Sequence, residues 1–188
     1  MTVLHLWATS RYRQFEALTE MLSVKPIQGK NKIRRVTIHQ RKPLNTGLFF
    51  NIHQVCLSKK KVPQIHMIVI DDWDFTDGAS PEITFKILQN ITSALTKFEG
   101  IHVVCVDFIS RMEFNDELNF QTRIGNFKSK AEQLSKNNPS HFHYFDNEDY
   151  LDFTHCNDGT PLTEHELDAA TTHFYVNLEQ VIEELEQI

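Results

Sequence analysis

The sequence predicts an α/β protein in which helices cover both faces of a parallel sheet. Strand-like and helix-like segments alternate along all 188 residues. Each of five expected strands is followed by a helix or a helix-containing segment, the connection that parallel strands require. The third strand-like segment, "QIHMIVID" (64–71), is almost continuously apolar. Such a composition is typical of a strand buried on both faces.

Hydrophobic periodicity and helix-capping residues predict the strands and helices. We expect strands over 2–8, 32–40, 64–71, 101–109 and 141–146, and helices over 10–24, 46–59, 81–98, 115–136 and 162–188. Ser80, Pro81 and Glu82 supply an N-cap, a first-turn proline and an early acid. Gly100 is expected to end that helix, and Thr163 to cap the last one.

The expected strand order places the functional loops. A doubly wound, flavodoxin-like sheet has the order 2-1-3-4-5, and sites in such sheets lie at the carboxyl ends of the strands, beside strand 1. The corresponding loops here are 8–11, 41–47, 71–80, 110–115 and 147–162. The loop "DDWDFTDG" (71–78) raises the question of an active site because it offers several carboxylates directly after the buried strand.

Composition indicates one globular domain over residues 1–188. The hydrophobic fraction of 40% argues against disorder, and no apolar run is long enough to span a membrane. Cys56, Cys105 and Cys156 are scattered and form no CxxC, so we expect buried, reduced thiols. With no basic leader at the start, we expect an intracellular protein, cytoplasmic or nuclear.

Charge is distributed unevenly along the chain. Residues 1–61 hold 12 of the 19 Lys and Arg but only two acids, a formal net charge of +10, whereas residues 62–188 have a net charge of −16. Such polarity predicts a basic face and an acidic face. There are three alternatives for their role: the basic face binds an anionic partner, the two faces attract a second copy of the protein, or they pair with each other within the fold. The nucleic-acid-binding candidates are Arg11, Arg13, Lys30, Lys32, Arg34, Arg35, Arg41, Lys42, Lys59, Lys60 and Lys61. The alternative is a solvated edge strand kept from aggregating by its charges.

No motif predicts a cofactor. There is no GxGxxG after the first strand and no GxxxxGK[ST], which argues against a dinucleotide or P-loop site. "HFH" (141–143) and "HCND" (155–158) contain metal-ligand residue types, but no second cluster of known spacing accompanies them. The ten histidines look like general composition. We therefore expect no metal.

The order of the loops resembles the SGNH/GDSL hydrolases. Strand 1 ends in "WATSRYRQF", where that family has a Gly-Asp-Ser nucleophile loop, and strand 3 ends in "IDDWDF", where it has a Gly-x-Asn-Asp loop. Arg123 and Asn126 in "RIGNF", the strand "HYFD" and the segment "NDGTPLT" are similar to the family's C-terminal half. The resemblance implies a three-layer αβα domain and a serine hydrolase site.

Carried over position by position, most of that site is missing. Ser10 falls at the nucleophile position, Leu44 at the position of an oxyanion-hole backbone donor (or Gly47 if the alignment slips), and Trp73 at that of the oxyanion Asn. Asp158 matches the catalytic Asp, but Pro161 replaces the catalytic His and has no group that accepts the serine proton. Asp74 adds negative charge where an oxyanion would form.

The resemblance leaves three functions open. A catalytically dead SGNH-like domain would act as a binding or scaffold module, comparable in kind to the SGNH-like domain of Oskar, which binds RNA. An active esterase or acyltransferase would use Ser10 with His155 as base and Asp152 orienting it. A self-assembling or protein-binding adaptor would use its oppositely charged faces, with Leu178, Val181, Ile182 and Leu185 as an interface unless that stripe is core. The first is favoured, with RNA or a protein as partner.

Overall fold

Five parallel strands form one sheet in the described part of the chain. The computed structural model describes residues 2–8, 20–21, 24, 33–39, 46–58, 62–71, 80–108, 118–146 and 163–187. The strands are β1 (Thr2–Ala8), β2 (Ile33–His39), β3 (Gln64–Asp71), β4 (Ile101–Phe108) and β5 (Phe142–Asp146). They pair in parallel in the order β2-β1-β3-β4-β5. The predicted fold class and strand order are confirmed.

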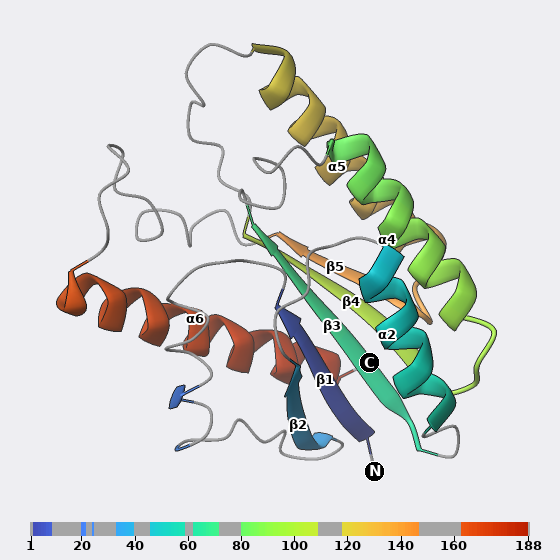
Figure 1. Cartoon of the computed structure of the whole chain (residues 1–188), viewed down its shortest axis with the longest axis horizontal. Coiled ribbons are helices and arrows are strands. Elements are labelled where there is room, and N and C mark those ends of the chain that lie inside the picture. The colour runs from blue at the N-terminus through green and yellow to red at the C-terminus, as the bar shows by residue number, and fades with distance from the viewer. Residues whose placement is uncertain are drawn as a thin grey trace.

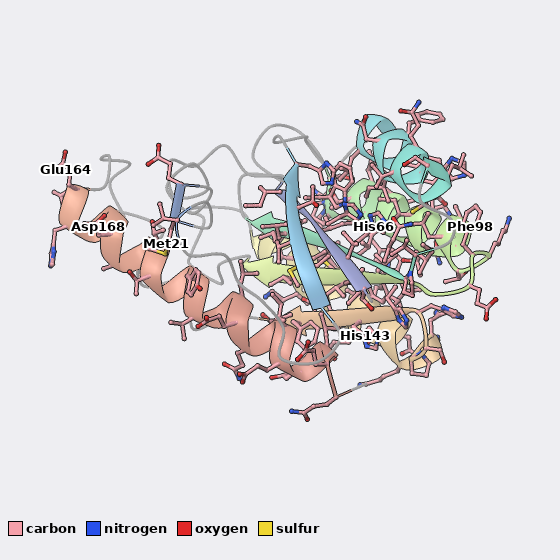
Figure 2. All side chains as sticks on the ribbon, turned by 90° about the horizontal axis from the view of Figure 1, so that it is seen from below. Met21, His66, Phe98, His143, Glu164 and Asp168 are labelled. Carbon is pink, nitrogen blue, oxygen red and sulfur yellow. The ribbon has the colours of Figure 1, made fainter. Side chains whose placement is uncertain are left out.

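The described helices cover both faces of the sheet. One side carries α2 (Thr46–Ser58), α4 (Pro81–Leu95) and α5 (Leu118–Asn137), and the other carries α6 (Glu164–Leu185), as Figure 1 shows. Their bounds lie within three residues of the predicted ones. Of the helix predicted over 10–24, the structure describes only Glu20, Met21 and Val24. Met21 packs beside α6 (Figure 2).

The central strand β3 is buried along its whole described length. Residues 64–70 are all buried, as expected for a strand with neighbours on both sides and helices on both faces. Alternate residues point to opposite faces. Met67 and Val69 join the core under α6, whereas Ile68 and Ile70 join the core under α2, α4 and α5. Burying each of these side chains contributes about 1.5–3 kcal/mol.

The apolar stripe of α6 belongs to the core. Leu178, Val181, Ile182 and Leu185 pack in one cluster with residues of β1, β3 and β4, and each is at most 7% exposed. The interpretation of this stripe as core is therefore confirmed, and the interface interpretation is wrong. Within the described residues, no helix is both long and apolar enough to cross a membrane.

Two of the three cysteines can be assessed. Cys56 on α2 and Cys105 on β4 are buried and not in disulfides, which confirms the prediction of buried thiols for this pair. Cys156 lies outside the described residues.

Helix α4 begins at the predicted cap and ends at Leu95, three residues before the predicted end. The Oγ of Ser80 accepts a hydrogen bond from the backbone N–H of Ile83 at 3.2 Å, and Pro81 occupies the first turn. At the other end a short turn over 96–100 finishes at Gly100, whose φ of +74° is unfavourable for any residue with a Cβ. The Gly100 carbonyl then accepts from the backbone N–H of Gln64, which joins this turn to the start of β3.

Replacing Ser80 by Ala should destabilise the protein by about 1 kcal/mol, because the first turn of α4 loses its side-chain acceptor. Chemical denaturation followed by circular dichroism measures the change. Ser93→Ala, an exposed position on the same helix, is the matched control and should cost no stability. Equal stabilities of the two variants would contradict the capping role.

Candidate functional site

The strand order places the expected site beside the carboxyl end of β1. This is the switch point of the topology, because β2 and β3 are added on opposite sides of β1. The loops that leave this edge fall outside the described residues. The described residues nearest to the edge include Trp7 on β1 and His39 on β2, which are register partners.

A cluster of aromatic and imidazole rings lies directly beneath this edge. The rings of Trp7 and His39 are parallel, with centroids 3.7 Å apart and an interplanar angle of 4°. His5 Nδ1 lies 3.0 Å from His39 Nε2, and the ring of His5 stacks on that of His66 at 4.9 Å. One hydrogen bond and two stacking contacts therefore link β2, β1 and β3 through side chains.

The hydrogen bonds of His66 fix its tautomer. The indole N–H of Trp7 can only donate, and it lies 3.1 Å from His66 Nδ1. Nδ1 is therefore the acceptor, and a neutral ring carries its proton on Nε2. That N–H has two acceptors within reach, Gln64 Oε1 at 3.2 Å and Cys56 Sγ at 3.1 Å. The ring is thus bonded on both nitrogens.

Burial keeps His66 and Cys56 uncharged near neutral pH. Burial, and to a smaller degree the neighbouring His5 and His39, lower the pKa of His66 from 6.5 to about 3. Burial raises the pKa of the Cys56 thiol from 9.0 to about 12, against a smaller opposing effect of a backbone hydrogen bond. His66 is thus a poor general base and Cys56 a poor nucleophile. Both side chains are also nearly inaccessible to solvent.

The cluster therefore links neighbouring strands through side-chain contacts. It occupies the side of the sheet covered by α2, which contributes Cys56 (Figure 2). Polar groups in a core are tolerated when their partners are also inside. Here Trp7, His66 and Gln64 satisfy one another, so the interior accommodates them without charge.

Sequence reasoning missed this cluster because it treated the histidines as background composition. One usable signal was present. Each of the three strands that the order 2-1-3 places side by side contains a histidine, in "HLW", "IHQ" and "QIHM". The register pairs His5 with His66 directly. A parallel register therefore brings two of the rings together, but the register itself is not readable from the sequence.

Of the predicted serine hydrolase residues, the structure describes Gly47, the alternative oxyanion-hole donor, which lies exposed in the first turn of α2. Those proposed for catalysis and those assigned to a vestigial site all lie outside the described residues: Ser10, Leu44, Trp73, Asp74, Asp152, His155, Asp158 and Pro161. The predictions made for them stay predictions.

The predicted basic residues lie within β2 or close in sequence to the ends of β1, β2 and β3. Arg34 and Arg35 lie within β2, an outer strand, near a register shift opposite Thr2 and Val3. The other basic candidates lie outside the described residues, although the chain ties each of them to a strand end. In the sequence, Lys30, Lys32 and Lys59–Lys61 precede the amino ends of β2 and β3, whereas Arg11, Arg13, Arg41 and Lys42 follow the carboxyl ends of β1 and β2.

Two ion pairs tie α5 to its surroundings. Arg123 donates two hydrogen bonds to Glu82, from Nε at 2.9 Å and from Nη2 at 2.7 Å, joining α5 to the first turn of α4. The hydrogen bonds from Arg123 lower the pKa of Glu82 to about 2. Lys128 is only 5% exposed and donates to Asp146 at the end of β5, at 2.9 Å. A buried ammonium requires such a partner.

A second group of histidines lies at the amino ends of β4 and β5. The ring of His102 lies 6.2 Å from that of His141 and 6.1 Å from that of His143. Burial and then the nearby His102 lower the pKa of His143. Among the residues that the structure describes, no group of three or more His, Cys, Asp or Glu side chains is arranged to hold a metal ion.

No protein-family model matches the sequence, and no curated protein is detectably similar to it. The structure shows a five-stranded parallel sheet of order 2-1-3-4-5 with alternating helices.

The lowered pKa of His66 predicts that the free energy of unfolding decreases in mild acid. This pKa is depressed in the fold, so the unfolded chain binds the extra proton once the pH falls below about 6.5. The contribution is fully present above that pH and decreases toward pH 3. The free energy of unfolding should fall by up to about 1.4 kcal/mol per pH unit from this group alone.

Denaturant titrations between pH 7 and pH 5 measure this slope. His66→Gln keeps an amide that can accept from Trp7 and should show a smaller slope than the wild type. His165→Gln, at an exposed position on α6, is the control and should keep the wild-type slope. An unchanged slope in His66→Gln would show that His66 does not govern the acid response.

Proposed function

We propose that this chain is a non-catalytic SGNH-hydrolase-like module that binds RNA along the β2 edge of its sheet. The observation that supports this most is the position of β2. It is an outer strand, and it lies within a stretch, residues 21–70, that contains no acidic residue. The edge strand β2 therefore lies in the middle of the basic part of the sequence.

Chain connectivity spreads the basic charge along that edge. β2 has seven residues, which span about 20 Å at the usual rise per residue. Lys30 and Lys32 precede it and Arg41 and Lys42 follow it, each within three residues of the strand. Positive charge at both ends and within the strand suits an extended polyanion better than a single small anion.

The acidic part of the chain is concentrated elsewhere. α6 contains six Asp and Glu and no Lys or Arg. It covers the opposite face of the sheet from α2, α4 and α5. Phosphates are repelled by such a helix, so the side of the molecule that carries α2 is the one that suits RNA.

Two lines of reasoning favour binding over catalysis. Beneath the carboxyl edge, burial lowers the pKa of His66 and raises that of Cys56, so His66 is a poor base and Cys56 a poor nucleophile. In the SGNH-like alignment, Pro161 and Trp73 stand where the family has its His and its oxyanion Asn. Loss of the oxyanion donor alone costs on the order of 10²–10³ in rate.

RNA binding should depend steeply on salt and on Arg34 and Arg35. Because consecutive residues of a strand point to opposite faces, one of the two is expected to contact a phosphate. The double variant Arg34→Gln/Arg35→Gln should therefore reduce the slope of log K against log salt by about 0.7, the contribution of one phosphate contact with a single strand. Fluorescence anisotropy with a labelled single-stranded RNA measures this from 50 to 300 mM salt.

The matched control removes two lysines from α5, which packs against β5 at the edge of the sheet opposite β2. Lys130→Gln/Lys136→Gln changes two exposed residues of this helix and should leave the slope unchanged. Absence of measurable RNA binding by the wild type at low salt would refute the proposal. Equal reductions of the slope in the two double variants would show that binding depends on the net charge of the protein and not on the basic residues of β2, which would also contradict the proposal.

Activity-based labelling tests the esterase alternative. A fluorophosphonate probe should leave the wild type unlabelled, because the proposal leaves Ser10 without a base. Labelling that disappears in Ser10→Ala and in His155→Ala would instead establish the Ser10, His155 and Asp152 site. A labelled active serine esterase measured in parallel shows that the probe is competent.

A further inference from the structure

The helix α2 has an unusual surface. Its 13 residues, "TGLFFNIHQVCLS", contain no Asp, Glu, Lys or Arg. Leu48, Ile52 and Cys56 are buried against the sheet at intervals of four. On the outer side Phe50 is 59% exposed and Leu57 is 39% exposed. Surface helices generally present charged and polar residues to water, so the exposed side of α2 needs an explanation.

Phe50 is held at one end of a row of rings. Its centroid lies 5.6 Å from that of Phe49, in an edge-on arrangement of 64°. Phe49 contacts His53 at 6.0 Å, and His53 contacts Phe98 at 6.1 Å. Phe49 and Phe98 pack against the buried cluster under α2, α4 and α5. Phe50 is therefore an exposed ring supported by partly buried ones.

The charges around α2 favour an anionic partner. Arg41 and Lys42 precede the helix in the sequence and Lys59–Lys61 follow it directly. The nearest acids before and after it in the sequence are Glu20 and Asp71. In Figure 2, Glu164 and Asp168 at the start of α6 lie at the far end of the molecule from Phe98.

We propose that Phe50 stacks on an unpaired base, so that the RNA bound by this protein is single-stranded. This inference rests on the proposed function and specifies its ligand. Single-stranded nucleic acid is bound by basic surfaces that hold the backbone and by aromatic side chains on which bases stack. Bases inside a duplex are stacked on each other, so an exposed Phe on a helix offers nothing to them.

Two other occupants fit α2 less well. Helices that lie in a membrane surface combine an apolar face with a strongly charged one, and α2 has no charged residue. Its apolar side chains mostly face the sheet, leaving Phe50 and Leu57 as the exposed large ones on this helix. A second copy would cover the helix without any need for the flanking basic residues. Both occupants are separated from RNA by the test.

The test compares single-stranded and duplex RNA by anisotropy. Phe50→Ala should weaken binding of a 12-nucleotide oligo(U) by about 5- to 150-fold, the loss expected for one stacked base, and should leave duplex binding and the salt slope unchanged. Phe50→Trp should restore the affinity, and oligo(U) should quench the fluorescence of this variant more than that of the wild type. Val176→Ala, which is 52% exposed on α6, is the control with wild-type affinity.

The outcomes separate this inference from the function on which it rests. If the wild type binds no RNA, the proposed function fails and the stacking proposal fails with it. If the wild type binds and Phe50→Ala binds oligo(U) equally well, or loses duplex binding to the same extent, the stacking proposal alone is overturned.

Light scattering and vesicle sedimentation complete the test. Phe50→Ala should keep the wild-type mass and the wild-type binding to vesicles of anionic lipid. A change in mass overturns stacking in favour of a second copy, and lost vesicle binding overturns it in favour of a membrane. Unchanged thermal unfolding of Phe50→Ala, expected because the ring is largely exposed, confirms that the fold is intact.

Discussion

The structure depends on the burial of β3 over residues 64–70. A strand without solvent contact must have a hydrogen-bonded neighbour on each side and a covering layer on each face. This requirement places β1 and β4 beside it, α6 on one face, and α2, α4 and α5 on the other. Because His66 and Gln64 are buried with the strand, their polar atoms require hydrogen-bond partners within the interior. Trp7 and Cys56 supply the partners of His66 from the neighbouring strand and helix.

Most of the architecture could be predicted because it follows from local signals. The apolar run of β3, the Ser80 cap and the turn at Gly100 are each readable within a few residues. The histidine cluster could not be predicted in the same way. It depends on the register between strands that are distant in sequence, and a one-residue slip would send His5 and His66 to opposite faces. The exposure of Phe50 likewise depends on how α2 rotates against the sheet.

The candidate site was less predictable than the fold. The resemblance to the SGNH hydrolases rests on loop order, and its proposed catalytic and vestigial site residues lie outside the described residues. Arg123 shows why a resemblance does not by itself assign a role. It matches the family-like segment "RIGNF", yet in the structure its guanidinium joins α5 to Glu82 on α4. The charge polarity of the chain, which needs no alignment, carries the functional argument further.

The bond between Trp7 and His66 has a consequence for the history of this chain. Changing either residue alone leaves a polar atom of the other without its partner in the interior, at a cost of about 1–3 kcal/mol. A lineage that loses one of the pair is therefore under pressure to replace the second as well. Distant descendants that have kept this interior should carry both residues or neither, separated by a similar interval, even where the surrounding loops have diverged beyond detection.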